Sequence, residues 1–145
     1  MILNIKKEIK IIFSIILILF ILIVGILSIF LILITANENY TEENYIKYLI
    51  FTTDEIKNSP RISNNYIIMY RSMDGNSPQI NEITYINTKN KKKIEEYVKS
   101  IGYIFIEKND FGEKWQDSND HYRTIYITEN PDEKKITLSV EYSQY

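Results

Sequence analysis

The sequence has no cysteine, one histidine, four glycines and three prolines among its 145 residues. Without cysteine there can be no disulfide, no thiol nucleophile and no thiolate ligand for zinc. The single histidine, His121, excludes a site in which two histidines bind a metal or share acid–base catalysis. So few glycines leave no glycine-rich phosphate loop. We therefore expect no cofactor, no metal site and no catalytic residue. The sequence does not exclude enzymatic activity, but it favours a non-enzymatic protein.

A strong excess of charge of one sign is also missing, since 17 Lys and Arg oppose 19 Asp and Glu. The charges are unevenly placed, because residues 1–36 carry a net charge of +2 and residues 37–145 carry −4. A nucleic-acid backbone requires a basic face. We therefore expect no nucleic-acid partner for this mildly acidic chain.

One long apolar run is present, because residues 11–34 contain no charged side chain. As a helix rising roughly 1.5 Å per residue, this run is about 36 Å long, which exceeds the ~30 Å hydrocarbon thickness of a bilayer. We predict a single transmembrane helix whose partner is the lipid bilayer. Lys6, Lys7 and Lys10 precede it, so the positive-inside rule places the N-terminus in the cytoplasm and the C-terminal domain outside the cytoplasmic membrane.

A cleaved signal peptide is the alternative interpretation of the same run. Its apolar core is ordinarily ~7–15 residues long and is followed by a small-residue cleavage site. The tripeptide Ile34-Thr35-Ala36 matches such a site poorly. We therefore favour an uncleaved signal anchor. The predicted organisation is a cytoplasmic flank at 1–10, a transmembrane helix at 11–34, a linker at 35–40 and a soluble α+β domain at 41–145.

Two helices are predicted in that domain. The first begins at Thr41 and ends before Pro60, with Tyr45, Leu49 and Ile56 at helical spacing. It could pack in the core or lie on the membrane, and core packing is favoured because its polar face mixes acidic with basic residues. The second helix spans 89–101, where the apolar residues recur at i, i+3, i+4 and i+7.

About five strands are predicted from short apolar or alternating runs, at residues 66–70, 82–87, 103–107, 121–128 and 136–142. In the last run, every second residue is apolar. Such one-sided alternation is typical of an antiparallel sheet with one solvated face. We therefore predict an α+β fold in which a small, mostly antiparallel sheet packs with the two helices.

The candidate site residues are aromatic. Aromatic side chains are enriched at protein-recognition surfaces, and Trp115 lies in a polar stretch. Trp115, Phe111 and Tyr122 are therefore the candidate protein-binding residues. Five carboxylates of the 107–120 segment suggest calcium binding or hydrolysis, but turn chemistry explains them more simply. They are Glu107, Asp110, Glu113, Asp117 and Asp120.

The leading hypothesis is a membrane-anchored, non-enzymatic binding module outside the cytoplasmic membrane, with another protein as its partner. A toxin-immunity protein is one version, because an acidic surface suits a basic partner. The abundance of Ile, Asn, Lys and Tyr suggests a bacterial source with an AT-rich genome. The alternatives are an envelope hydrolase that uses carboxylates of the 107–120 segment, and a structural subunit of an envelope complex.

Overall fold

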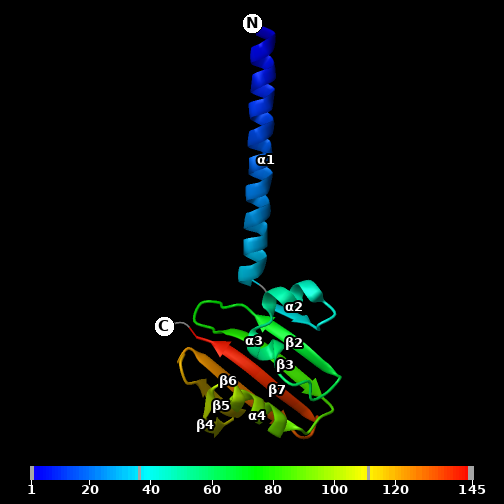
Figure 1. The fold of residues 1–145 in the computed structure, drawn as a ribbon, viewed down its shortest axis with the longest axis vertical. Coiled ribbons are helices and arrows are strands. Elements are labelled where there is room, and N and C mark those ends of the chain that lie inside the picture. The colour runs from blue at the N-terminus through cyan, green and yellow to red at the C-terminus, as the bar shows by residue number, and fades with distance from the viewer. Residues whose placement is uncertain (1, 36, 111, 144–145) are drawn as a thin grey trace. The chain divides into compact units, whose positions relative to one another are not determined.

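The computed structural model describes the backbone of residues 2–35, 37–110 and 112–143, with the side chains of 9–31 in the first range. The chain divides into two compact units, Met1–Thr35 and Ala36–Tyr145. The first unit is one helix, α1 (Ile2–Thr35), coloured blue in Figure 1.

Helix α1 presents apolar side chains on all sides. Its stretch Ile9–Leu31 is long and apolar enough to cross a membrane, and none of it is buried in the protein. The hydroxyls of Ser14 and Ser28 donate to the carbonyls of Lys10 and Val24 at 2.9 and 2.8 Å. Such internal bonds are required where no water is present. The predicted apolar helix is confirmed, and its length and composition suit an anchor or a signal sequence.

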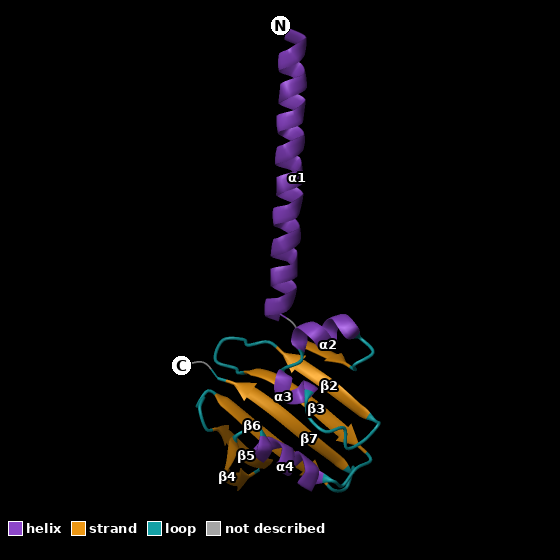
Figure 2. Ribbon diagram, viewed as in Figure 1, coloured by secondary structure: helices purple, strands orange, loops and turns teal. Residues whose placement is uncertain are grey.

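The second unit is built on one seven-stranded antiparallel sheet in the order β1-β2-β3-β7-β6-β5-β4 (Figure 1). The strands are β1 (Asn37–Tyr40), β2 (Tyr66–Arg71), β3 (Gln79–Ile86), β4 (Tyr103–Asn109), β5 (Gly112–Asp117), β6 (Arg123–Asn130) and β7 (Lys135–Tyr142). Three helices accompany them, α2 (Tyr45–Phe51), α3 (Asp54–Lys57) and α4 (Lys91–Ser100), shown in purple in Figure 2. The predicted α+β class is confirmed, whereas the expectation of about five strands was too low by two.

The core lies between one face of the sheet and the helices. Ile68, Ile83, Leu138 and Ile127 are directly paired across β2, β3, β7 and β6, and all are buried. Helix α4 packs on β4 and β6, while α3 packs on β3 and β7. Each buried aliphatic side chain contributes about 1.5–3 kcal/mol relative to exposure. The helix predicted at 89–101 is therefore confirmed as the cover of this face.

The single helix predicted to begin at Thr41 and end before Pro60 is wrong in its extent, because two short helices replace it. Thr52 and Thr53 between them are extended, with ψ of 126° and 161°. This break lets the Thr53 N–H donate to the side-chain oxygen of Asn81 at 2.8 Å, and Asn81 is fully buried. The interruption is therefore set by a buried amide on β3, far away in the sequence.

The expected core packing of the first helix is also wrong for α2. Its only buried side chain is Phe51. The side chains of Tyr45, Ile46, Leu49 and Ile50 are between 53% and 70% exposed. The apolar stripe that was predicted to face the core is thus largely exposed.

Two strands were missed by the sequence analysis. Strand β1 occupies most of the segment predicted as the linker 35–40, and it pairs with β2 from Asn37↔Arg71 to Tyr40↔Ile68. Strand β5 lies in the polar stretch around Trp115, where no strand was predicted. Both strands are largely polar, so their pairing with neighbours overrides their weak intrinsic strand preference.

Helix α3 is held on the sheet by a polar cluster around Glu55. One carboxylate oxygen accepts from the Tyr103 hydroxyl at 3.3 Å and from Arg123 at 3.4 Å, and the other accepts from the Tyr142 hydroxyl at 3.1 Å. The Tyr97 hydroxyl donates to the Glu55 carbonyl at 2.7 Å. Burial and the nearby carboxylate raise the pKa of Tyr97 to about 12 and also raise the pKa of Tyr103 and Tyr142. The hydroxyls therefore stay protonated as donors.

Replacing Glu55 tests this cluster. We expect Glu55→Ala to lower the free energy of unfolding by about 2–4 kcal/mol, because buried donors then lose a charged acceptor. Asp54→Ala is the matched control in the same helix, since the Asp54 side chain is 89% exposed. It is expected to change stability by less than about 0.5 kcal/mol. Denaturant unfolding of the full chain in detergent measures both, and equal effects would contradict the cluster's role.

Candidate functional site

Of the three predicted recognition residues, the structure describes Trp115 and Tyr122, which differ in exposure. Phe111 lies outside the described residues. Trp115 is only 8% exposed, and its ring meets Phe105 edge-on with centroids 5.4 Å apart. Tyr122 is 41% exposed just before β6, which is the third strand from the β4 edge. Trp115 therefore supports a neighbouring aromatic residue and is not itself an exposed anchor.

Phe105, the aromatic neighbour of Trp115, belongs to the edge strand β4. Ile104, Phe105 and Ile106 follow one another in β4, and their side chains are between 48% and 58% exposed. Strand β4 ends the sheet, so only β5 pairs with it. The strand 103–107 was predicted, but its position at the edge was not, because sheet order cannot be read from local alternation.

A bulge explains why three successive apolar side chains are exposed. Phe105 pairs with Trp115 and Glu107 pairs with Lys114, so Ile106 is the extra residue between them. Phe105 shares the helix-covered face with Trp115, whereas Ile104, which pairs with Gln116, is on the opposite face. The edge therefore presents apolar surface on both faces of the sheet and at the bulge.

A surface hollow of about 470 Å³ lies beside this edge. Its lining includes Lys99 and Tyr103 with Ile104, Phe105 and Trp115. The indole N–H of Trp115 is buried and has no hydrogen-bond partner among the described residues. An unsatisfied buried donor costs about 1–3 kcal/mol. The walls of the hollow are mainly apolar.

The opposite edge of the sheet has a different character. Strand β1 is four residues long, with the sequence Asn-Glu-Asn-Tyr. Short, polar edge strands are a common protection against unwanted pairing. The first three residues of β4 after Tyr103 lack this protection, so the two edges are not equivalent.

A second candidate site is a groove of about 390 Å³ on the uncovered face of the sheet. Its lining includes Arg71, Glu82, Tyr126 and Glu141. Burial raises the pKa of Glu82 and of Glu141, while Arg71 opposes both shifts. Carboxyl groups with raised pKa in a groove are able to exchange protons closer to neutral pH. The sequence analysis missed this pair because its members come from β3 and β7.

Three of the five carboxylates of the 107–120 segment form ion pairs or turn hydrogen bonds. Glu113 pairs with Lys91 at 2.6 Å, and Asp120 pairs with Arg123 at 3.1 Å. Asp117 accepts from the Asn119 backbone N–H at 2.8 Å. Across the described ranges, no group of three or more His, Cys, Asp and Glu residues is placed to hold a metal ion. These contacts give turn and ion-pair roles to these three carboxylates.

No protein-family model, no curated protein and no solved structure matches this chain. The apolar β4 edge and the carboxylate groove are the two candidate functional sites of the described domain.

The raised pKa of Glu82 predicts how the stability of the domain depends on pH. Because the folded pKa of Glu82 is raised, its stabilising contribution is full below the ordinary value of about 4.3 and is lost as pH rises through the folded pKa. We expect Glu82→Gln to raise stability at neutral pH and to leave it unchanged in acid. A glutamine oxygen can still accept from the Thr84 hydroxyl, which lies 3.1 Å from Glu82.

Glu96→Gln is the control, since Glu96 lies on the exposed side of α4 and pairs only loosely with Lys92 at 3.8 Å. Thermal unfolding at several pH values measures both variants. A loss of stability for Glu82→Gln at neutral pH would show that the fold stabilises the ionised carboxylate. That result would contradict the expectation that burial destabilises this ion.

Proposed function

We propose that this chain is a single-pass, membrane-anchored protein-binding module whose domain lies outside the cytoplasmic membrane. Its β4 edge binds an extended segment of a partner protein, which adds a strand to the sheet. The observation that carries this proposal is the run Ile104-Phe105-Ile106, exposed on an edge strand.

An edge strand leaves backbone N–H and C=O groups unpaired, and these attract another extended chain. In strand addition, main-chain hydrogen bonds supply affinity and pockets for alternate side chains supply specificity. The hollow beside Phe105 and Trp115 provides such a pocket. An extended segment with apolar side chains is therefore the ligand that fits.

The membrane anchor in this proposal is α1. All its described side chains are exposed, and lipid is the environment in which so many apolar side chains are stable. The lysines of the N-terminal flank support the orientation with the domain outside the cytoplasmic membrane. A toxin-immunity protein is one version of such a module, because the net charge of −4 on residues 37–145 suits a basic partner.

The carboxylate groove supports an envelope hydrolase less well. Polar and charged side chains are the ordinary covering of the solvated face of an antiparallel sheet. Exposed apolar residues on an edge strand are not ordinary, because native edges are commonly blunted by charge or proline. The β4 edge is therefore the better-supported functional surface.

Site-specific cross-linking tests the proposal in the membranes of cells that express the full chain. A photoreactive residue replaces Ile104 in one variant and Lys92 in the control, since Lys92 is exposed on α4 and does not line the hollow beside β4. We expect an adduct with another protein from position 104 and none from position 92. Adding Ile106→Lys to the first variant is expected to reduce the adduct roughly tenfold, which corresponds to losing about 1.4 kcal/mol of apolar burial.

Equal adducts from the two positions, or none from position 104, would overturn this assignment. An adduct with the mass of two chains would show that the edge binds a second copy and not a different protein.

A further inference from the structure

Helix α2 carries a second exposed apolar surface. Tyr45, Ile46, Leu49 and Ile50 occupy positions i, i+1, i+4 and i+5, so they share one side of the helix. We call this set the α2 face. Monomeric soluble domains seldom leave contiguous apolar surface of this kind uncovered.

The α2 face is presented by a firmly held helix. On its other side, Phe51 stacks on Tyr70 with ring centroids 4.8 Å apart, and it also meets Tyr40 at 6.4 Å. Lys47 of α2 forms an ion pair with Glu38 of β1 at 2.5 Å. The exposure of the α2 face is therefore a property of the packed domain.

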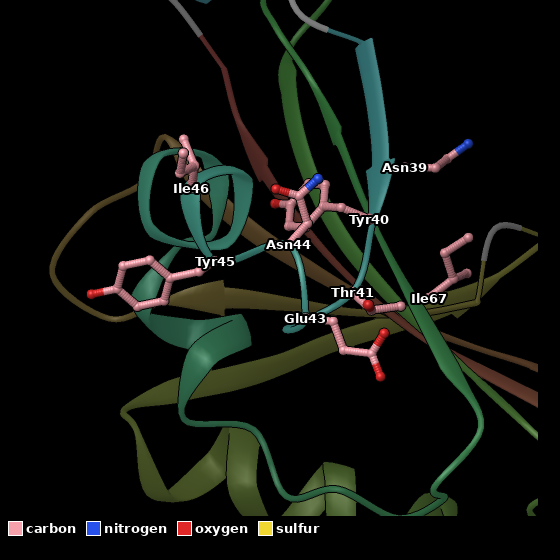
Figure 3. A pocket seen from close by; sticks show the side chains of 8 residues that line it. All are labelled: Asn39, Tyr40, Thr41, Glu43, Asn44, Tyr45, Ile46 and Ile67. Atoms are coloured by element: carbon pink, nitrogen blue, oxygen red, sulfur yellow. The ribbon is translucent and has the colours of Figure 1, made fainter.

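A hollow of about 720 Å³ is lined by Tyr45 and Ile46 of the α2 face together with residues of β1 and β2. Figure 3 shows Tyr45 and Ile46 projecting from α2, with Asn39 and Ile67 on the strands that complete the lining. Ile67 is 41% exposed and adds further apolar surface to this edge of the domain. Apolar groups thus gather around the β1 edge, where the chain enters the domain.

The covalent chain limits what can cover this surface. Helix α1 ends at Thr35 and β1 begins at Asn37, so one residue joins them. Because consecutive Cα atoms are about 3.8 Å apart, Asn37 lies within about 8 Å of the end of α1. The next residue, Glu38, is the ion-pair partner of α2. The α2 face thus belongs to the end of the domain that follows α1 directly in the chain.

We infer that α2 lies on the surface of the membrane that α1 spans and inserts the α2 face into the boundary between headgroups and acyl chains. This inference rests on the anchoring role given to α1 in the proposed function. Interfacial helices bury their apolar face about 5–10 Å into that boundary, where the amphipathic ring of a tyrosine is also favoured.

Apolar insertion, and not headgroup charge, supplies this contact. Lys47 is the only basic residue of α2, and Glu38 neutralises it. An interfacial helix that depends on anionic lipid carries several Lys or Arg residues on its polar face. The contact is therefore expected to form equally well on zwitterionic and on anionic lipid.

The contact would also fix the orientation of the domain. A span joined by a single connection leaves the domain free to rotate, whereas a second contact at α2 restricts it. Strand β1 forms one edge of the sheet and β4 forms the other, six strand spacings away. At about 4.8 Å per spacing, the partner-binding edge is separated by roughly 29 Å from the edge that follows α1 in the chain.

The absence of cysteine makes a depth measurement direct, because one introduced thiol can be labelled alone. The full chain is reconstituted in phosphatidylcholine vesicles with a fluorophore on Ile46→Cys or, as the control, on Lys92→Cys. Both positions are exposed, so the label disturbs no core packing. We expect nitroxide-labelled lipids to quench position 46 several-fold more strongly than position 92, most of all with the nitroxide high in the acyl chain.

The vesicle-bound fraction is measured on the same samples, which separates this inference from the anchor. Equal quenching at the two positions in a chain that stays with the vesicles would overturn the inference and leave the anchor standing. Loss of the chain from the vesicles would overturn both. Quenching at position 46 that requires anionic phosphatidylglycerol would contradict apolar insertion as the source of the contact.

Discussion

The apolar surface of α1 is the constraint on which the rest of the structure depends. The stretch Ile9–Leu31 contributes no buried side chain to the core of the described chain, and its apolar side chains are less stable in water than in an apolar environment. The folded domain starts two residues after this helix ends, at the edge strand β1. On our proposal, the bilayer therefore determines which edge of the sheet is tethered and leaves β4 as the edge available to a partner.

Within the domain, the side chains of Asn81 and Glu55 form hydrogen bonds that connect the helices with the sheet. The side chain of Asn81 accepts from the Thr53 N–H and donates to the Met69 carbonyl. The Glu55 carboxylate accepts from two tyrosine hydroxyls. Such satisfied groups stabilise one arrangement of α2, α3 and the sheet. Against this background, the exposed apolar residues of α2 and β4 stand out as surfaces that the fold leaves unpartnered. They lie toward opposite edges of the sheet, which suits one surface for attachment and one for recognition.

Local periodicity predicted the elements whose formation is decided locally. The apolar length of α1, the helical spacing of Ile94 and Val98 in α4, and the alternation of β7 were each sufficient. The break between α2 and α3, the polar strands β1 and β5, and the edge position of β4 depend on residues distant in the sequence. Trp115 shows the same limit, since its polar neighbours suggested exposure while its pairing with Phe105 and Ile125 buries it.

Carbonate extraction combined with protease treatment of spheroplasts tests the central claim most directly, using a full chain with a C-terminal tag. We expect the chain to stay in the membrane pellet at full mass, and protease added to intact spheroplasts to remove the tag. A tag that is protected in intact spheroplasts would place the domain in the cytoplasm. A chain that washes free at reduced mass would identify α1 as a cleaved signal sequence, and either result would contradict a module anchored outside the cytoplasmic membrane.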